Sequence, residues 1–280
     1  MKIRKVTGRQ GAKEFLTVPK LLYRNDPHWV CPLDREIEAV FDPDKNPYYR
    51  HGDAVRYVLK DDDGQLIGRV AAFFDNNTAY THDQPTGGMG FFECIHDQMA
   101  ANMLFDKAKE WLIQQGMEAM DGPVNFGETD KYWGLLVNGF SHPAYEIAYN
   151  YSYYQELFEY YGFKTYYKQE GFHLDLTKPL PQRFEKIANW IANKPEYTFE
   201  HFSWRSLDRH VNDFAEVFNQ AWASFKQNFE PLEPMYIKNT LRKAKAILEE
   251  EFIWLAYHRN RPVAIYLMYP DVNMILKHLD

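Results

Sequence analysis

The sequence predicts an α/β protein with two domains, and three observations support that fold class. Residues 87–163 read in order as a strand, a helix, a second strand and a tyrosine-rich helix. Two pairs of apolar, β-branched or aromatic runs, each pair separated by a charged turn, have the pattern of β-hairpins. The order strand, helix, helix, hairpin occurs in both halves of the chain, so we expect one arrangement of elements to occur twice.

The elements of the first 75 residues are one strand, two helices and a hairpin. They are expected, in order, as a strand at 2–7, helices at 11–23 and 34–41, and hairpin strands at 54–59 and 66–74. Asp61–Gly64 between the last two strands is a strong turn signal. Pro19 interrupts the helical spacing of the first helix.

Residues 87–176 continue with alternating elements. They are a strand from Met89, a helix at 97–115, a strand at 117–126, a tyrosine-rich helix ending at Phe163, and a hairpin or two joined strands at 164–176. Asp97 is an N-cap residue type and Gly116 is a helix-stop residue, so the boundaries of the first helix are well marked.

The second half begins at a stiff linker, Lys178–Pro181, which places a domain boundary between residues 176 and 177. Beyond it we expect helices at 184–192, 207–225 and 235–248, and strands at 197–204, 251–257 and 262–269. The predicted domains are therefore 1–176 and 177–280.

The bulk composition limits the possible functions. The 280 residues are 45% hydrophobic and 25% charged, which is ordinary for a globular protein with a substantial core. The 17% of aromatic residues predicts bulky cores and aromatic-lined grooves. The net charge of −7 argues against a general nucleic-acid-binding or anionic-membrane-binding surface, because both need a basic field. The sequence has no run of about 18 apolar residues, so we expect no membrane span.

Cysteine and histidine usage narrows these classes further. Cys31 and Cys94 are the only cysteines, too few for a disulfide framework and typical of a reducing compartment. The first residues carry charge without a following apolar stretch, so we expect a cytoplasmic protein rather than a secreted one. The ten histidines lack the spacing of metal ligands, and we expect no metal site.

The two halves share more than their order of elements. Val55–Asp75 and Phe252–Asp271 both read as strand, charged turn, strand and terminal aspartate. Four motifs follow the order found in tandem-GNAT bacterial proteins: Pro27–Trp29, Phe41–Pro47, Gly90–Glu93 and Asn150–Tyr154. The chain therefore resembles the GNAT acyltransferase superfamily, and within it tandem proteins whose substrate is unassigned.

This resemblance implies a mixed sheet and a GNAT-like acyl-CoA N-acyltransferase fold. One complete copy would span residues 1–176, followed by the first half of a second copy. The implied cofactor is acetyl-CoA or another acyl-CoA, and the implied partner is a small amine or amino-acid-like substrate. The second copy would stop after its third strand, which leaves an open edge at Pro262–Tyr269. We expect that edge to be covered by the first domain's sheet, a swapped chain or a neighbour, so a homo-oligomer is one expectation.

The resemblance also assigns roles to residues. Glu93 lies on the strand that supplies backbone donors and often a carboxylate base in the superfamily, which would make it the catalytic base. Its alternative is a carboxylate that pairs with an arginine or lysine, or points to solvent. Cofactor contacts fall on Phe92, Cys94, Ile95, Gln98 and Asn125. Substrate contacts fall on Trp133, Tyr153 and Tyr154, with Glu128 and Asp130 on the same long loop as Trp133.

Two positions depart from the superfamily's pattern. The loop Cys94–Ala100 has no glycine to let the backbone approach a pyrophosphate, and Asp97 puts an anion there. Phe158 stands where the final helix commonly carries a tyrosine that protonates the thiolate. Three hypotheses therefore stay open: a CoA-dependent N-acyltransferase, a catalytically degenerate GNAT scaffold that binds a ligand or a partner, and a Fem-type peptidyltransferase, against which the acidic charge argues.

Overall fold

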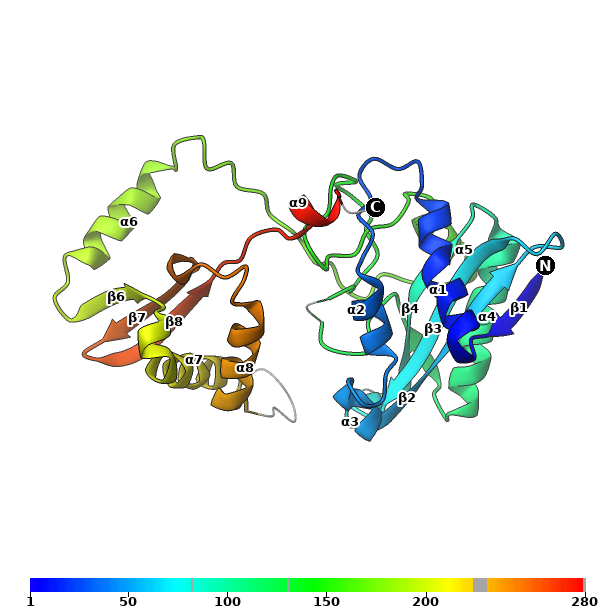
Figure 1. Cartoon of the computed structure of the whole chain (residues 1–280), viewed down its shortest axis with the longest axis horizontal. Helices are drawn as coiled ribbons and strands as arrows, with labels where there is room; N and C mark the ends of the chain where they lie inside the picture. Colours follow the sequence, from blue (N-terminus) through cyan, green and yellow to red (C-terminus); the bar gives the residue numbers. More distant parts are fainter. Residues whose placement is uncertain (82, 130, 224–230, 279–280) are drawn as a thin grey trace. The chain divides into compact units, whose positions relative to one another are not determined.

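The computed structural model describes residues 1–81, 83–129, 131–223 and 231–278. They form two compact units (Figure 1): unit 1 comprises Met1–Glu170 and the segment from Val272 onward, and unit 2 comprises Gly171–Asp271. The sequence places a boundary between residues 176 and 177, whereas the units divide after Glu170. The return of the chain to unit 1 at Val272 has no counterpart in the sequence analysis.

Unit 1 is built on a five-stranded mixed sheet in the order β1-β2-β3-β4-β5. Its strands are β1 (Lys2–Lys5), β2 (Gly52–Lys60), β3 (Leu66–Asp75), β4 (Thr86–Cys94) and β5 (Ala119–Asp121). The first four strands pair antiparallel, and β4 pairs parallel with β5 over Thr86–Gly88. The predicted α/β class with a mixed sheet is confirmed.

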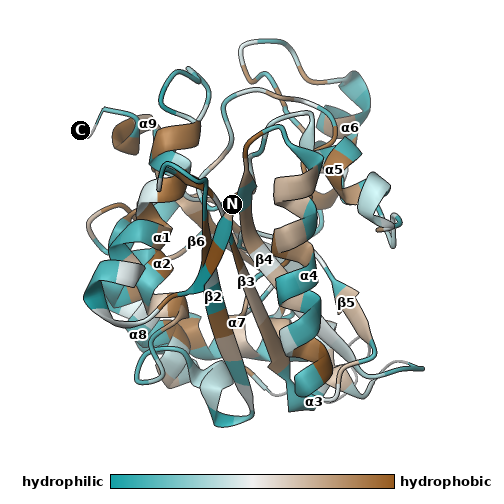
Figure 2. Ribbon diagram, turned by 90° about the vertical axis from the view of Figure 1, so that its right-hand side faces the viewer, coloured by the Kyte–Doolittle hydropathy of each residue, from teal (hydrophilic) through white to brown (hydrophobic). Residues whose placement is uncertain are grey.

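Helices cover both faces of this sheet. They are α1 (Gly8–Leu22), α2 (Asp34–Val40), α3 (Asn76–Ala79), α4 (Gln98–Gln114), α5 (Tyr154–Tyr161) and α9 (Asn273–Leu276), with a 3₁₀ helix at Pro47–Arg50. Strands β2, β3 and β4 stand between α1 and α2 on one side and α4 on the other (Figure 2). Successive side chains of β2 point to opposite faces of the sheet: Tyr57 and Leu59 pack in the cluster with α4, and Val58 packs in the cluster with α1.

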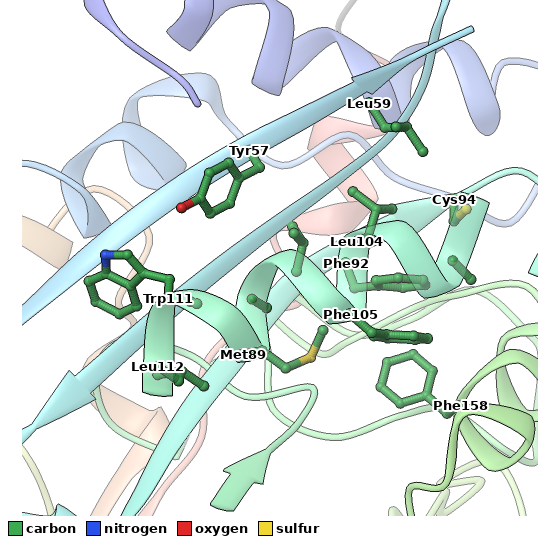
Figure 3. Close-up of a cluster of buried hydrophobic side chains, with 14 of the residues drawn as sticks. Tyr57, Leu59, Met89, Phe92, Cys94, Leu104, Phe105, Trp111, Leu112 and Phe158 are labelled. Atoms are coloured by element: carbon green, nitrogen blue, oxygen red, sulfur yellow. The ribbon is translucent and has the colours of Figure 1, made fainter. Parts of the chain in front are cut away.

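The core between the sheet and α4 is rich in stacked aromatic rings (Figure 3). Phe105 of α4 stacks on Phe92 with 4.6 Å between ring centroids, and meets Phe158 of α5 edge-on at 4.8 Å. Phe158 is buried in this cluster. The position where the superfamily commonly carries a tyrosine is therefore an apolar core position here.

The boundaries of α4 follow the sequence signals. The Asp97 carboxylate accepts a hydrogen bond from the Ala100 backbone N–H at 2.8 Å, which satisfies one of the free donors of the first turn. Gly116 has φ +83°, the left-handed conformation that glycine adopts without strain, and it ends the helix. Both predictions are confirmed.

Two strand predictions for residues 117–176 are corrected. The strand predicted at 117–126 is reduced to β5, Ala119–Asp121. The hairpin or joined strands predicted at 164–176 do not form; those residues are irregular. Their apolar side chains find no sheet face to pack against, as Phe172, 90% exposed, illustrates. Alternating apolar residues predict a strand only where a neighbour buries one face.

Unit 2 has a three-stranded antiparallel sheet in the order β6-β7-β8. Its elements are α6 (Gln182–Ala192), β6 (Tyr197–His201), α7 (Leu207–Trp222), α8 (Pro234–Ala244), β7 (Ile253–His258) and β8 (Arg261–Leu267), with 3₁₀ helices at Trp204–Ser206 and Glu250–Phe252. The helix predicted to reach residue 225 is described as far as Trp222, and residues 224–230 lie outside the described residues. The helix predicted to reach 248 ends at Ala244.

The two units share one order of elements, which in unit 2 follows α6. Unit 1 runs β1-α1-α2-β2-β3 and unit 2 runs β6-α7-α8-β7-β8, with antiparallel pairing throughout. In unit 2, β8 is an outer strand of the described sheet. The expectation that this edge is covered, and that the protein forms a homo-oligomer, stays a prediction.

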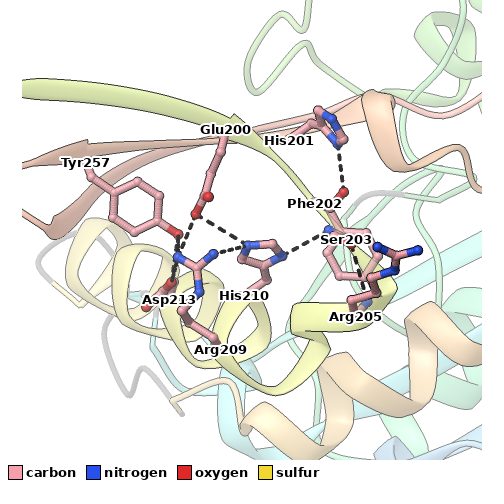
Figure 4. Close-up of polar contacts among 9 residues, drawn as sticks. All are labelled: Glu200, His201, Phe202, Ser203, Arg205, Arg209, His210, Asp213 and Tyr257. Atoms are coloured by element: carbon pink, nitrogen blue, oxygen red, sulfur yellow. Dashed lines mark hydrogen bonds and ion pairs between the residues drawn. The ribbon is translucent and has the colours of Figure 1, made fainter.

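A polar cluster fastens α7 to the sheet of unit 2 (Figure 4). Arg209 donates to the Glu200 carboxylate of β6 at 2.6 Å, and this hydrogen bond lowers the pKa of Glu200. Tyr257 of β7 donates to Asp213 at 2.7 Å. Each of these groups has a partner across the helix–sheet contact, so the cluster accounts for the position of α7.

The described residues contain neither a candidate membrane-spanning helix nor a candidate metal-binding group. No helix in that part of the chain is long and apolar enough to cross a bilayer. The same residues contain no group of three or more histidine, cysteine, aspartate or glutamate side chains arranged to hold a metal ion.

Candidate functional site

A bulge in β4 determines which side chain of that strand faces α1. Ala71 of β3 is opposite Gly90, but Arg69 is opposite Glu93, so β4 has one residue more than β3 in this interval. Phe91 takes up the extra length with φ +50°, a left-handed conformation that is uncommon for phenylalanine. Without the bulge Phe92 would stand opposite Arg69. With the bulge, Phe92 packs in the core and the Glu93 carboxylate stands opposite the Arg69 guanidinium.

Glu93 is buried and has three partners. Its Oε2 accepts hydrogen bonds from the hydroxyls of Tyr23 and Tyr154, both at 2.8 Å. Its Oε1 lies 3.5 Å from the guanidinium of Arg69. The alternative in which this carboxylate pairs with an arginine is therefore realised. Glu93 is 9% exposed and Arg69 is 5% exposed, so the pair is almost completely desolvated.

Arg69 is held on its other side by α1. Its guanidinium donates to the Phe15 carbonyl at 3.0 Å and lies 4.7 Å over the Phe15 ring. Its Nε has no hydrogen-bond partner among the described residues. The pairing with Glu93 is long for a charge-assisted bond, so Arg69 neutralises the carboxylate incompletely.

Burial dominates the titration of this cluster. Desolvation raises the pKa of Glu93, opposed first by the charge of Arg69 and then by the hydrogen bonds from Tyr23 and Tyr154. Desolvation lowers the pKa of Arg69. Burial and the neighbouring Glu93 raise the pKa of both tyrosines well above the usual range. Glu93 therefore binds a proton more readily than a glutamate in water does.

This direction gives a pH dependence with a defined sign. Because the folded-state pKa of Glu93 lies above the unfolded value, its contribution to stability is full below the unfolded pKa and is lost as the pH rises through the folded pKa. We expect the unfolding free energy of the wild type, minus that of Glu93→Gln, to fall as the pH rises from about 4, the ordinary pKa of a glutamate in the unfolded chain, to neutral and alkaline values. Urea unfolding of both proteins across that range measures it, and a constant or rising difference would contradict the burial argument.

A pocket of about 110 Å³ lies beside this cluster. Arg69, Glu93 and Tyr154 are part of its wall, and Glu146 adds a second carboxylate. Aromatic rings make up much of the remaining surface: Trp29, Phe91, Tyr132, Tyr145 and Tyr149. The pocket is therefore an apolar, aromatic space with a few polar groups, which is the usual composition of a small-molecule site.

The α9 segment also contributes to this pocket. Asn273 and Leu276 are buried and belong to its lining. The Asn273 side chain donates to the Pro143 carbonyl at 2.9 Å. Asn273 and Leu276 are thus far along the sequence from all the other lining residues.

Two of the residues that the resemblance assigns to the cofactor, Cys94 and Ile95, already have backbone partners within the chain. The Cys94 N–H donates to the Tyr154 hydroxyl at 3.0 Å, and the Tyr153 hydroxyl donates to the Cys94 carbonyl at 2.7 Å. The Ile95 N–H donates to the Ile67 carbonyl at 3.0 Å. At the end of β4 the backbone groups of Cys94 and Ile95 are therefore engaged by side chains and by β3.

The start of α4 is occupied in the same way. Asp97 already accepts from the first turn, so its negative charge stands where a phosphate would approach. Gln98 donates to Asn102 and to the Leu157 carbonyl. These residues fit a capped helix rather than a phosphate cradle, and binding of acetyl-CoA or another acyl-CoA stays a prediction.

The remaining predicted residues separate into two groups. Tyr154 lies in the pocket wall and on Glu93. Trp133 donates to the Tyr167 hydroxyl at 2.8 Å, Tyr153 stacks on His96 at 4.4 Å, and neither belongs to the pocket lining. Asn125 is buried outside that lining, and its side-chain oxygen has no hydrogen-bond partner in the described part of the chain.

On the long loop, Glu128 accepts from the Tyr48 hydroxyl at 2.9 Å. Asp130 lies outside the described residues. Neither therefore adds to the pocket as it is described.

Sequence reasoning missed several residues of this site. The sequence could have pointed to Arg69, because a single cation within the apolar run of β3 needs a partner when it is buried. Tyr23 lies 70 residues before Glu93, and no local pattern in the sequence predicts a contact over that separation. No local pattern predicts the contribution of Asn273 either.

Comparisons with known proteins find distant similarities only. No family model matches it. Protein YghO of Escherichia coli (strain K12) is 24% identical over 289 residues, covering 99% of this chain and 70% of that protein.

Two solved structures have similar arrangements. One is a GCN5-related glucosamine N-acetyltransferase region of a fungal multi-domain GH3 β-N-acetylglucosaminidase, with 13% identity, a TM-score of 0.49, and coverage of 94% of this chain and 27% of that chain. The other is a predicted acetyltransferase from Clostridium acetobutylicum, determined with acetyl-CoA, with 14% identity, a TM-score of 0.39, and coverage of 63% of this chain and 96% of that chain.

Proposed function

Given the GNAT-like fold of unit 1, we propose that this unit binds a small amine or amino-acid-like molecule in the aromatic pocket beside Glu93. The incompletely neutralised carboxylate carries the proposal. Glu146 is held by Lys131 at 2.6 Å, whereas Arg69 reaches Glu93 only at 3.5 Å. A ligand cation beside Glu93 would relieve the cost of burying that charge.

The aromatic walls favour the same ligand class. An ammonium group over the face of a tryptophan or tyrosine gains roughly 0.5–2 kcal/mol, more when water is excluded. Eight aromatic residues line the pocket, and Trp29 is itself stacked on Tyr23, one of the partners of Glu93. The rings and the carboxylate together select a positive group with an apolar body.

A ligand panel tests the proposal. We expect primary amines and amino acids at millimolar concentration to raise the thermal midpoint of unit 1, and neutral isosteres of the same shape to have no effect. Glu93→Gln should abolish the shift, because the amide keeps the shape but not the charge. Glu118→Gln, an exposed residue outside the pocket, is the matched control and should keep it. Equal shifts with amines and neutral isosteres would contradict the proposal.

Acyl transfer to that amine is the second candidate, and the bulged strand favours it. The bulge turns the carboxylate of Glu93 toward the pocket, and its raised pKa suits a group that accepts a proton from an ammonium. An acyl-CoA would supply the acyl group when bound. Its binding at the end of β4 would first have to break the hydrogen bonds between the Cys94 backbone and the hydroxyls of Tyr153 and Tyr154.

The layout of the whole chain remains part of the proposal. The shared order of five elements supports unit 2 as the first half of a second GNAT copy. A cytoplasmic location is the setting in which we expect this activity.

A further inference from the structure

The hydroxyl of Tyr132 differs from the other tyrosine hydroxyls of the pocket lining. The other three each donate to a carboxylate at 2.7–2.8 Å: Tyr145 to Glu36, Tyr149 to Asp26 and Tyr154 to Glu93. Tyr132 also lines the pocket, but its hydroxyl has no hydrogen-bond partner within the described part of the chain. This hydroxyl therefore remains available to a bound molecule.

The backbone holds Tyr132 beside the bulge that positions Glu93. Its ring lies 6.0 Å from the ring of Phe91, which stands two residues before Glu93 on β4. Its N–H donates to the Glu146 carbonyl at 2.8 Å. Phe91, Tyr132 and Glu146 all line the pocket and all have left-handed backbones, with φ between +48° and +62°. Such conformations are strained for these residue types and concentrate at ligand sites, which supports a binding role for this wall.

The charges around the Tyr132 hydroxyl are mostly negative. Glu36 on α2 accepts from Tyr145 through Oε1, and its buried Oε2 has no hydrogen-bond partner among the described residues. Burial, followed by the charges of Glu146 and Glu36, raises the pKa of Tyr132. Glu146 is paired with Lys131, whereas Glu36 has no ion-pair partner in the part of the chain that the structure describes. A ligand carboxylate at Tyr132 would therefore meet like charge, but a neutral carbonyl would not.

The volume of the pocket limits the size of the bound group. It is about 110 Å³, somewhat less than the roughly 150 Å³ of an apolar cavity that holds benzene. The enclosed part of a ligand thus has about five or six non-hydrogen atoms. The pocket is partly open to solvent, so a longer substituent can extend outward.

We propose that the pocket selects amines that carry a neutral hydrogen-bond acceptor beside the ammonium group, such as amino-acid amides, and discriminates against free amino acids. The ammonium group lies at Glu93, and the neutral carbonyl accepts from the Tyr132 hydroxyl. The charge of Glu36 disfavours a carboxylate in place of that carbonyl. An attractive and a repulsive element together give the selectivity. This inference rests on the proposed amine site and narrows its substrate class.

Three molecules with the same number of non-hydrogen atoms test the inference: alaninamide, alanine and 3-methylbutan-2-amine. Each carries an ammonium group beside a methyl group, and they differ in the third substituent, which is a neutral amide, a carboxylate or an isopropyl group. Calorimetric titration of the full chain at about pH 7, where each amine is mostly protonated, measures the affinities. We expect alaninamide to bind about 5-fold tighter than 3-methylbutan-2-amine and at least about 10-fold tighter than alanine.

Two variants separate the two elements of the selectivity. Tyr132→Phe keeps the ring and should reduce the preference for alaninamide over 3-methylbutan-2-amine to less than about 2-fold. Glu36→Gln keeps an acceptor for Tyr145 and should reduce the preference for alaninamide over alanine at least about 3-fold. Tyr160→Phe, at an exposed position outside the pocket lining, is the matched control and should keep both preferences.

The outcomes distinguish this inference from the proposed amine site. An affinity for alanine equal to or above that for alaninamide would overturn the inference, and so would unchanged preferences in Tyr132→Phe or in Glu36→Gln. Equal binding of all three molecules would also overturn it but would leave the amine site in place. Binding of none of the three would overturn the amine site and the inference together.

Discussion

Replacement of Arg69 by methionine is expected to lower the unfolding free energy of unit 1 by about 3–5 kcal/mol. The change removes the counter-charge of a carboxylate that is 9% exposed, and it leaves the Phe15 carbonyl without its donor. Breaking one side of a buried pair costs far more than the pair is worth, because the remaining charge stays desolvated. Urea unfolding of the full chain, followed through the hydrogen-exchange protection of β3 and β4, measures this loss.

Two variants control the result. The double variant Arg69→Met with Glu93→Gln should recover much of the loss, because the amide oxygen still accepts from Tyr23 and Tyr154 without a charge. Lys20→Ala breaks an exposed ion pair with Asp34 and should change the unfolding free energy by about 0–1 kcal/mol. A loss of the same small size for Arg69→Met would show that the pair is open to water.

Truncation of Phe105 to alanine is expected to cost about 3–5 kcal/mol of unfolding free energy. Phe105 is fully buried, and its ring contacts Phe92, Phe158 and Phe163 with centroids within 5.3 Å. Removal of the ring leaves a cavity between the sheet, α4 and α5 that the fixed strands cannot fill. The same urea experiment measures the loss.

Ile113→Ala is the matched control, because Ile113 lies on the same helix but is exposed. We expect it to change the unfolding free energy by about 0.5 kcal/mol or less. Similar losses for the two variants would contradict the packing of α4 and α5 around Phe105.

Local signals account for the parts of the fold that the sequence predicts correctly. Asp61–Gly64 makes the β2–β3 hairpin, and Asp97 and Gly116 mark the ends of α4, because each acts on the backbone within a few residues of itself. Residues 164–176 have strand-like composition but lack a partner to bury their apolar side, and composition cannot supply one.

The site was less predictable because its geometry depends on register and on distant contacts. Glu93 was identified as a site residue, but its pairing with Arg69 follows from the bulge at Phe91, a shift of one residue that no local pattern announces. The closure of Cys94 by Tyr153 and Tyr154 joins positions about 60 residues apart. The lining by Asn273 requires the chain to return to unit 1 after unit 2.

The central claim is that the pocket beside Glu93 is the amine-binding site of the folded protein. Calorimetric titration of the full chain with the best amine of the panel, and separately with acetyl-CoA at millimolar concentration, tests it most directly. The account predicts saturable heat with the amine, lost in Glu93→Gln; saturable heat with acetyl-CoA as well would support acyl transfer, the second candidate. Saturable binding of acetyl-CoA by a protein that binds no amine would contradict it.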